Sequence, residues 1–387
     1  MIPDLSAKAI RVLWLGPCHS DQALYGRKAV NQAATQWSRG LLRGLVAHGC
    51  VVRVGSHCQD QYWPGGDLWP GRDLDFDAEY LVNAVHYLNV FGLRDATLRC
   101  AYRRMVIREI TMFRPDIVLT YNLPSYFCAT SDILLQHGIK WVPIILDQDD
   151  PEPDAWASFR ESTSKASGLI FLSYWGYQNY PFQLPSLYLD GGVERWRGDD
   201  VLFCQDEKCV VYSGKIDDRY GGVEKLFQIF SLVHGSDCRF VLTGKDPRKK
   251  IYKYLRREPR AEYYGFLSDC ELHALHAKAS VFVNPRPPEV SDNRMTFPSK
   301  LLQYLSYGKP VVSTWTDGLA PDYRDLLMVP SRHLIVEYAN LIERALSYDM
   351  NERLERSRTI KQWILETHTW EKQAARLITW MSDLLFF

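Results

Sequence analysis

The stretch DNRMTFPSKLLQYLSYGKPVVST, residues 292–314, carries the signals of a loop, a helix and a strand in succession. Pro298 suits the first turn of a helix, because its missing N–H would have no helical partner there. Leucine and tyrosine then recur at helical spacing, and Gly308 suits the end of a helix. Pro310 prevents the helix from continuing, and residues 311–314 indicate a buried strand. The stretch therefore predicts a loop–helix–strand unit of an α/β domain.

The start of this predicted helix is a candidate phosphate site. A helix N-terminus offers free amide groups and a partial positive charge, which together favour an anion by about 0.3–1 kcal/mol. Phe297, Pro298 and Ser299 stand at this point, and Ser299 adds a hydroxyl group. The same pattern fits an ordinary helix–strand connection in which Ser299 only caps the helix. The stretch alone leaves both interpretations open.

Length and composition indicate a globular protein of two domains. The chain has 387 residues, of which 46% are hydrophobic and 24% are charged,. Lysine plus arginine and aspartate plus glutamate number 46 each, and this balance argues against a general nucleic-acid binder. The nine cysteines include no C-x-x-C pair, so we expect neither disulfides nor zinc, and a cytoplasmic location. We also expect no signal peptide and no membrane span.

Apolar strands alternate with helical patterns along the chain. Strands are predicted at 10–16, 50–54, 116–121, 140–146, 209–214, 239–244 and 280–285,. A glycine-rich and charged stretch at 187–200 interrupts the alternation as a linker would. The expected fold class is α/β, with two Rossmann-like parallel-sheet domains that face a cleft, because ligands of such sheets bind beyond the carboxyl ends of the strands.

This order of elements resembles the GT-B glycosyltransferases, specifically the retaining enzymes of glycosyltransferase family 4. Three segments carry the resemblance: NQAATQWSRGLLRGLVAHGCVVRV at 31–54, VVYSGKIDDRYGGVEKLFQIF at 210–230 and FPSKLLQYLSYGKPVVST at 297–314. The resemblance implies an acceptor-binding domain of residues 1–193 and a nucleotide-sugar-binding domain of residues 199–368. It also implies that a C-terminal helix, 369–387, crosses back to the first domain.

The resemblance implies two catalytic cations. Lys215 follows the strand 209–214, at the family position of a cation that stabilises the leaving diphosphate. A fixed cation there helps the transition state, in which the charge develops. The family's second cation falls at Gly221, and Arg219 is the nearest substitute. Both side chains are also compatible with ordinary surface charges.

Two family glutamates are replaced in this sequence. Their positions hold Met295 and Gln303. A glutamine carbonyl accepts a hydrogen bond as a carboxylate does, so Gln303 can keep a ribose contact, although a solvated helix residue is the alternative. Backbone groups at 293–296, or Glu289, would then bind the hydroxyl groups of the donor sugar. The full set of nucleotide-sugar candidates is Gly16, Gly214, Gly244, Phe266, Leu267, Asn293, Thr296, Phe297, Pro298, Ser299 and Gln303.

Some members of that set have a structural alternative. For Phe266 and Leu267, which the resemblance places at the base, the alternative is core packing. Lys245 is a further, weaker candidate beside Gly244. Gly16 would let the backbone approach the donor, although Pro17 after it lacks an N–H.

Polar residues follow two strands of the first domain and are candidates for acceptor binding. Asn122 stands where many family members have a histidine, and we place it among the catalytic residues. Ser125 follows it, and Asp147 and Asp149 follow the strand 140–146. The acidic run fits no EF-hand, and the resemblance implies no catalytic metal. A solvated loop is the alternative.

The predicted helix 94–113 carries five arginines between apolar residues. Such a helix can lie on an anionic membrane surface or bind a lipid-linked acceptor. The alternative is a solvated face packed on the core. The expected location is therefore cytoplasmic, with the inner face of the plasma membrane as a peripheral site.

The resemblance implies a retaining glycosyltransferase that moves a hexose, with glucose as best guess, from a UDP-sugar to a glycan or lipid-linked sugar. The leaving phosphate takes the acceptor proton, so neither a protein nucleophile nor a cofactor is expected. Two alternatives stay open. One is a non-catalytic GT-B subunit that binds a glycan or a partner protein, and the other is a different sugar-nucleotide enzyme such as an epimerase. The oligomeric state is left open.

Overall fold

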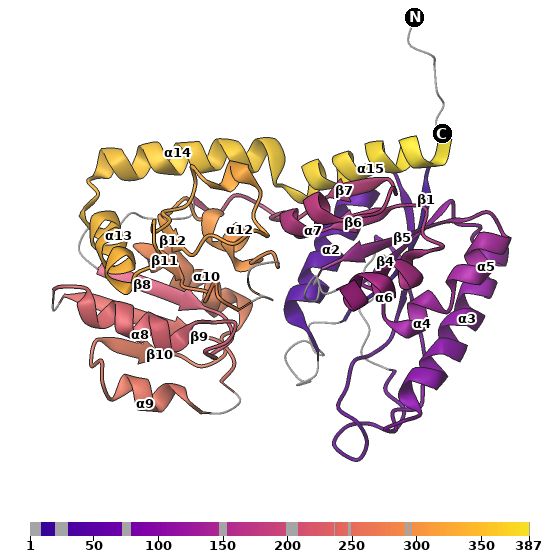
Figure 1. Cartoon of the computed structure of the whole chain (residues 1–387), viewed down its shortest axis with the longest axis horizontal. Coiled ribbons are helices and arrows are strands. Elements are labelled where there is room, and N and C mark those ends of the chain that lie inside the picture. Colours follow the sequence, from indigo (N-terminus) through magenta and orange to yellow (C-terminus); the bar gives the residue numbers. More distant parts are fainter. Residues whose placement is uncertain are drawn as a thin grey trace, which may run out of the picture. The chain divides into compact units, whose positions relative to one another are not determined.

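The computed structural model divides the chain into two compact units (Figure 1). Unit 1 comprises Met1–Gly192 and Trp370–Phe387, and unit 2 comprises Val193–Thr369. The structure describes residues 9–19, 30–71, 79–146, 153–198, 208–235, 237–246, 249–290, 293 and 296–386. The chain therefore leaves the first unit, builds the second, and returns.

Unit 1 is built on a seven-stranded sheet of order β3-β2-β1-β4-β5-β6-β7, with every neighbouring pair parallel. Its strands are β1 (Arg11–Leu15), β2 (Val51–Ser56), β3 (Leu81–Ala84), β4 (Ile117–Tyr121), β5 (Lys140–Ile145), β6 (Leu169–Phe171) and β7 (Ser186–Tyr188). Its helices are α2 (Gln32–Ala47), α3 (Arg94–Met112), α4 (Ser125–Cys128), α5 (Ser131–Gln136), α6 (Pro153–Thr163), α7 (Tyr174–Asn179) and α15 (Trp370–Phe386).

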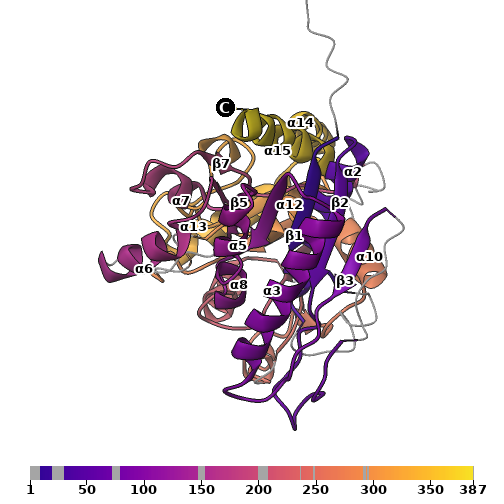
Figure 2. The same cartoon turned by 90° about the vertical axis from the view of Figure 1, so that its right-hand side faces the viewer.

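The C-terminal helix α15 packs on α2, and the two lie side by side in both views (Figures 1 and 2). Two glycines of α2 make this close approach possible. A Cβ at Gly40 would clash with the Trp370 indole, and one at Gly44 would lie 2.6 Å from the Trp370 carbonyl oxygen. The expected return of the C-terminal helix to the first domain is confirmed.

Unit 2 holds a five-stranded sheet of order β10-β9-β8-β11-β12, again parallel throughout. Its strands are β8 (Lys208–Ser213), β9 (Cys238–Thr243), β10 (Ala261–Tyr263), β11 (Val281–Asn284) and β12 (Val311–Ser313). Its helices are α8 (Val223–Leu232), α9 (Ile251–Leu255), α10 (Asp269–Lys278), α12 (Lys300–Leu305), the 3-10 helix η2 (Pro321–Tyr323), α13 (Ile335–Ser347) and α14 (Met350–Thr367).

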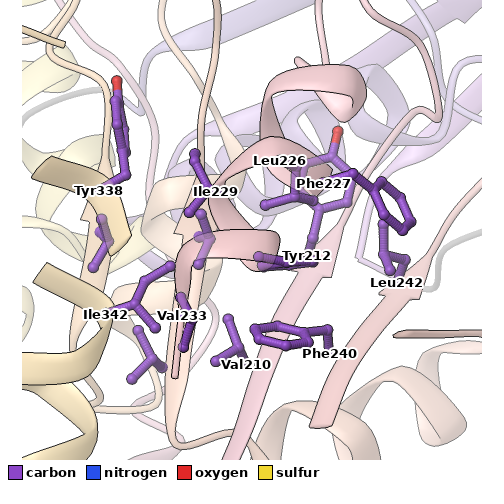
Figure 3. Close-up of a cluster of buried hydrophobic side chains, with 14 of the residues drawn as sticks. Val210, Tyr212, Leu226, Phe227, Ile229, Val233, Phe240, Leu242, Tyr338 and Ile342 are labelled. Carbon is purple, nitrogen blue, oxygen red and sulfur yellow. The ribbon is translucent and has the colours of Figure 1, made fainter. Parts of the chain in front are cut away.

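The core of unit 2 lies between the sheet and the helices α8 and α13 (Figure 3). Phe230 of α8 stacks on Phe240 of β9, with ring centroids 3.9 Å apart. Val210 and Ile342 are fully buried in the same cluster. Burial of such side chains is worth about 1.5–3 kcal/mol each, which makes the sheet a rigid support for the loops at its carboxyl edge.

The predicted α/β class with two parallel sheets is confirmed. The differences lie at short elements. The edge strands β3 and β7 are only partly buried, so their sequences give no apolar run of the kind that predicts the equally short but buried β12,. Pro298 precedes α12 instead of lying within its first turn, because Ser299 occupies the N-cap position. In the described parts of the chain, no helix combines the length and apolar character that a membrane crossing requires.

Candidate functional site

The carboxyl ends of β8, β9 and β10 are joined through glycine backbone. The Gly214 N–H donates to the Thr243 carbonyl (2.9 Å), and the Gly244 N–H donates to the Gly265 carbonyl (2.8 Å). Gly244 has a φ of +137°, and a Cβ there would clash with the Gly214 carbonyl oxygen. Glycine is therefore required at this position, and two of the predicted donor-site residues lie in direct contact.

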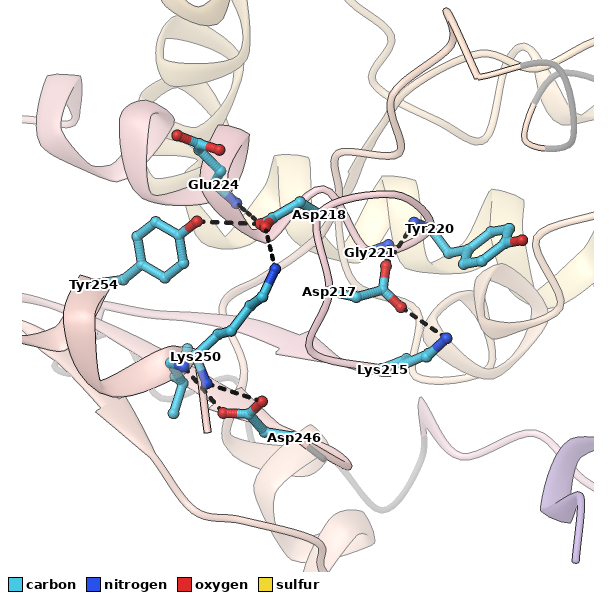
Figure 4. A network of polar contacts seen from close by, with 10 residues as sticks. Lys215, Asp217, Asp218, Tyr220, Gly221, Glu224, Asp246, Lys250 and Tyr254 are labelled. Atoms are coloured by element: carbon cyan, nitrogen blue, oxygen red, sulfur yellow. Dashed lines mark hydrogen bonds and ion pairs between the residues drawn. The ribbon is translucent and has the colours of Figure 1, made fainter. Parts of the chain in front are cut away.

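The loop 215–221, which follows β8, is organised by Asp217 (Figure 4). One carboxylate oxygen accepts the backbone N–H groups of Tyr220 (2.6 Å) and Gly221 (3.0 Å). The other lies 3.1 Å from the Nζ atom of Lys215. Burial opposes ionisation of Asp217, but the two amide hydrogen bonds and Lys215 outweigh it, so the pKa of this carboxyl is lowered,. Lys215 itself is 58% exposed at the end of the strand.

A second network braces the same loop from the side of α9 (Figure 4). Asp218 accepts the Glu224 N–H (3.1 Å) and the Tyr254 hydroxyl (3.2 Å), and Lys250 Nζ lies 3.5 Å from it. Asp246 accepts the Lys250 N–H (3.1 Å) at the start of α9. These carboxylates hold Lys215 on a loop that is fixed at both ends.

Gly221 occupies a position with no space for a side chain. A Cβ there would lie 2.5 Å from both the Lys215 carbonyl oxygen and the Tyr212 hydroxyl oxygen. The Tyr212 hydroxyl donates to that same carbonyl (2.9 Å). The second family cation is therefore excluded by packing at residue 221. Arg219, its predicted substitute, is exposed, with its guanidinium 5.2 Å from the Tyr220 ring centroid.

The segment after β11 lies against the loop 215–221. Asn293 is fully buried, and its Nδ2 donates to the carbonyls of Arg219 (2.6 Å) and Pro287 (3.1 Å). Its Oδ1 has no hydrogen-bond partner among the described residues. Arg286 donates to the Thr296 hydroxyl (2.9 Å). The structure thus brings the predicted Asn293 to the loop that carries Lys215, whereas Thr296 contacts Arg286 of its own segment.

Backbone N–H groups in the turn before α12 donate hydrogen bonds within the protein, which the sequence did not predict. The Ser299 N–H, expected to be free for a phosphate, donates to the Phe297 carbonyl (3.1 Å), and the Leu301 N–H donates to Pro298 (2.9 Å). The Ser299 side chain is exposed and makes no capping hydrogen bond. Phe297 is buried against Tyr323, with ring centroids 5.8 Å apart.

Helix α12 is fastened to the end of β8 by Tyr304. The Tyr304 hydroxyl accepts the Ser213 N–H (2.8 Å) and donates to the Ser213 carbonyl (2.9 Å). His276 Nε2 lies 3.0 Å from the Ser213 hydroxyl. Burial lowers the pKa of His276 to about 3, so the imidazole is neutral at pH 7. Gln303 is exposed on the same helix.

Lys300, to which the sequence assigned no role, lies at the same strand end. Its Nζ is 4.3 Å from the centroid of the Tyr212 ring, and a Cβ at Gly214 would clash with it. Burial and the charge of Arg286 lower the pKa of Lys300 to about 7, and Asp217 opposes this shift. A half-buried ammonium thus stands where β8 ends.

The segment after β10 presents an aromatic ring. Phe266 is 43% exposed, and Lys245 Nζ lies 4.9 Å from its ring centroid. The core packing considered as an alternative therefore does not describe Phe266. Leu267 beside it is half-buried.

The predicted residues of unit 1 have structural partners. A Cβ at Gly16 would lie 2.7 Å from the Tyr121 side chain and 2.8 Å from the Trp14 indole nitrogen. Packing of these rings therefore accounts for glycine here. Asn122 has a φ of +62° and accepts the Leu146 N–H on Oδ1 (2.9 Å). The Ser125 hydroxyl donates to the Asp95 carboxylate (2.7 Å).

Two predicted acceptor residues, Asp147 and Asp149, lie outside the described residues. Within the described ranges, no group of three or more His, Cys, Asp or Glu side chains is placed to hold a metal ion. His19, which follows β1, is hydrogen-bonded within unit 1. Its Nδ1 atom lies 2.9 Å from the Thr35 hydroxyl, and its Nε2 atom accepts the Gln59 N–H.

Residues 207–348, which cover most of unit 2, match the family model of the group 1 glycosyl transferases. The matched part of the chain is thus similar to the group 1 glycosyl transferases, and the likeness lies in unit 2. The match contains the whole of the strand-end arrangement described above, from Lys215 to Lys300.

Solved structures of GT-B glycosyltransferases match nearly the whole length of this chain. Sucrose-phosphate synthase from Thermosynechococcus elongatus is 13% identical, with a TM-score of 0.71 over 97% of this chain and 99% of that one. A glycosyltransferase from Rickettsia africae is 10% identical, with a TM-score of 0.73 over 98% and 99%. Anabaena HepE, solved with UDP and glucose, is 13% identical, with a TM-score of 0.67 over 97% and 100%. At these identities the likeness concerns the fold. No curated protein matches the sequence.

Two features of this candidate site were missed at the sequence level. One is Lys300, which the sequence shows only as a lysine directly before an apolar helix. The other is the steric exclusion at Gly221, since it depends on the path of the loop 215–221. The lysine in FPSK, beside a predicted phosphate site, was the one available signal.

Proposed function

We propose that this protein is a glycosyltransferase that transfers a hexose, with glucose as the first choice, from a UDP-sugar to a hydroxyl of a glycan or lipid-linked sugar. The observation that carries the proposal is Lys215 at the carboxyl end of β8, on a loop fixed by Asp217 and Asp218. Ligands of parallel sheets bind at this edge. A cation held there meets the diphosphate at the point where the charge of the leaving group develops.

The chemistry follows from that placement. The bond between the anomeric carbon and the β-phosphate oxygen breaks, and a bond to the acceptor oxygen forms. The acceptor proton passes to the departing phosphate, so the reaction balances without a protein nucleophile. Lys215 exchanges its carboxylate partner, Asp217, for the phosphate. Because Lys215 is 58% exposed and Asp217 keeps the hydrogen bonds from its two backbone amides, this exchange costs little.

The donor's base and sugar have candidate partners in unit 2. The exposed Phe266 ring beside Lys245 offers a stacking surface for a base,. The Oδ1 atom of Asn293, which has no hydrogen-bond partner in the part of the chain that the structure describes, offers an acceptor for a sugar hydroxyl,. Anabaena HepE was solved with UDP and glucose, and this supports the same donor class here. The exposed Gln303 keeps its proposed ribose contact.

The acceptor is proposed to bind unit 1. Asn122 contributes its Nδ2 group, because Oδ1 already accepts a backbone amide. Ser125 keeps only its lone pairs for an acceptor, since its proton is directed to Asp95. Asp147 and Asp149 complete the proposed set.

We propose that unit 1 also touches an anionic membrane, through a surface formed by α3 and the neighbouring loops. Arg99, Arg103, Arg104 and Arg108 are exposed on α3. Trp63, Trp69 and Phe91 are 53%, 65% and 80% exposed on the loops beside it. The guanidinium of Arg94 at the start of α3 lies 3.6 Å from the Tyr62 ring centroid, which joins loop and helix. Basic and aromatic side chains together favour the membrane interface.

Sedimentation with vesicles tests the membrane contact. The wild-type protein is expected to bind phosphatidylserine vesicles more than neutral ones, and the Trp69→Ala/Phe91→Ala variant is expected to lose that binding. Leu135→Ala, which changes an exposed residue elsewhere in unit 1, serves as the control. Equal binding by all three proteins would exclude this surface.

A panel of nucleotides and nucleotide sugars tests the donor. A ligand of the native state raises the melting temperature by mass action, so UDP and a UDP-hexose are expected to stabilise the protein. A non-catalytic subunit, which the two replaced glutamates favour, would respond to glycans and not to UDP. An absent response to every UDP compound would refute the proposed donor.

A further inference from the structure

Lys300 is a cation that no described group neutralises. Its Nζ lies over the Tyr212 ring, 4.3 Å from the centroid, and against the backbone of Gly214. Within the described residues, no carboxylate or carbonyl pairs with this ammonium. The face of the Tyr212 ring attracts the ammonium of Lys300, and a bound anion would neutralise its charge.

The neighbourhood of Lys300 is positively charged. Arg286 acts on it from the segment after β11, and Asp217 is the charge of opposite sign that faces it from the loop 215–221. That carboxylate is already engaged with two backbone amides and with Lys215. Lys300, Arg286 and Lys215 thus come from three separate segments, and Asp217 is the carboxylate that acts on Lys300 and pairs with Lys215.

The same region excludes a cation at residue 221. A Cβ there would lie 2.5 Å from the Tyr212 hydroxyl oxygen. Tyr212 therefore blocks a side chain from residue 221 with its hydroxyl and carries the ammonium of Lys300 on its ring. Tyr212 thus both prevents a cationic side chain at residue 221 and contacts the ammonium of Lys300.

We propose that Lys300 is the second phosphate-binding cation of this glycosyltransferase and takes the place of the cation that Gly221 excludes. The inference rests on the proposed nucleoside diphosphate sugar as donor. Lys215 and Lys300 approach the diphosphate from two segments, one exposed and one half-buried. A half-buried cation is worth more than an exposed one, because the effective dielectric around it is lower.

The test is calorimetric titration of UDP into the full-length protein. Lys300→Met is expected to weaken UDP binding at least tenfold, about 1.4 kcal/mol, and Lys300→Arg to weaken it only severalfold. Lys278→Met, at an exposed position of α10, is expected to leave the affinity unchanged. Melting of the unliganded variants reports whether each one folds.

Proton uptake distinguishes phosphate contact from a structural role. With the pKa of Lys300 lowered to about 7, most of the free protein has a neutral amine at pH 8. A bound diphosphate raises that pKa, so the wild type takes up a proton, measured by titration in buffers of different ionisation enthalpy. Lys300→Arg, which stays charged, is expected to bind UDP without this uptake.

The outcomes separate this inference from the proposed donor. If the wild type binds UDP and Lys300→Met binds it equally well, Lys300 has no phosphate role and the donor proposal stands. If uptake persists in Lys300→Arg, the proton belongs to another group and the inference fails. If the wild type binds neither UDP nor a UDP-sugar, both proposals fall together. Should Lys300→Met not fold, Lys300→Arg decides through its proton uptake.

Discussion

The carboxylate of Asp217 lies 3.1 Å from the ammonium of Lys215 while it accepts two backbone N–H groups of the same loop. The aspartate therefore does two things: it shapes the loop 215–221 and holds the lysine at the end of β8. The arrangement keeps a cation ready at the strand end without burying it.

Lys215→Ala is expected to reduce kcat/KM for a UDP-sugar by about 10²–10³, the effect of removing one group that stabilises transition-state charge. The free energy of unfolding of this variant should change by less than about 1 kcal/mol, because Lys215 is 58% exposed and two backbone amides still hold Asp217,. Lys208→Ala is the matched control, since Lys208 pairs with Asp237 at the opposite end of the same strand. Full turnover by Lys215→Ala would remove the role assigned to this lysine.

Gly244→Ala tests the close approach of β8 and β9. Both Gly244 and Gly49 have positive φ, but only Gly244 faces a backbone carbonyl, whereas Gly49 has open space. Gly49→Ala is expected to cost about 1 kcal/mol from its backbone conformation. Gly244→Ala is expected to cost about 1–3 kcal/mol more, measured by urea unfolding. Equal losses of unfolding free energy in Gly244→Ala and Gly49→Ala would contradict the close contact between Gly244 and Gly214.

Tyr304→Phe tests the fastening of α12 to β8. Removal of the hydroxyl leaves the buried Ser213 amide without its partner, which is expected to cost about 1–3 kcal/mol. The ring packing stays, so the loss reports the hydrogen bonds. Tyr252→Phe serves as control because Tyr252 is exposed. Denaturant midpoints of the two variants should differ clearly, and indistinguishable midpoints would argue against this role for Tyr304.

His276 makes stability depend on pH in the acid range. Its pKa is lowered from 6.5 to about 3 by burial, so between those values the unfolded chain binds a proton that the folded chain does not. Stability is then lost as the pH falls from about 6.5 to 3, by up to about 1.4 kcal/mol per pH unit. His276→Gln is expected to show a shallower fall in unfolding free energy over this window. Parallel curves for the two proteins would contradict the assignment.

Phe266→Ala is expected to weaken UDP binding by about 1–3 kcal/mol through loss of base stacking. The exposed ring contributes little to the core, so the melting temperature without ligand should stay close to that of the wild type. Phe91→Ala, an exposed ring of unit 1, is the control. An unchanged affinity of Phe266→Ala for UDP would show that the base binds to another surface.

The sequence predicts those parts of the fold that depend on long apolar runs. Strands such as β8 and β9 are buried along nearly their whole length, and their patterns are unambiguous. The short edge strands β3 and β7 depend on pairing with a neighbour that sequence patterns do not reveal. The N-cap at Ser299 was displaced from the predicted helix start by the turn that Phe297 and Pro298 make.

The site was less predictable, because its side chains are placed by tertiary contacts. Lys215 follows a strand, and its position could be inferred from that strand alone. The orientation of Lys300 depends on Tyr212 and Gly214, which lie far from it in the sequence. The sequence does not reveal a partner for the side chain of Asn122. In the structure its side-chain carbonyl joins the ends of β4 and β5.

The proposed function requires that the carboxyl edge of the unit 2 sheet hold the diphosphate of a sugar donor. Hydrogen exchange of the full-length protein, measured by mass spectrometry with and without UDP, tests it most directly. UDP is expected to slow exchange in peptides that span the loop 215–221 and the segment 264–267. Exchange that UDP leaves unchanged there, or slows only elsewhere in the chain, would contradict it.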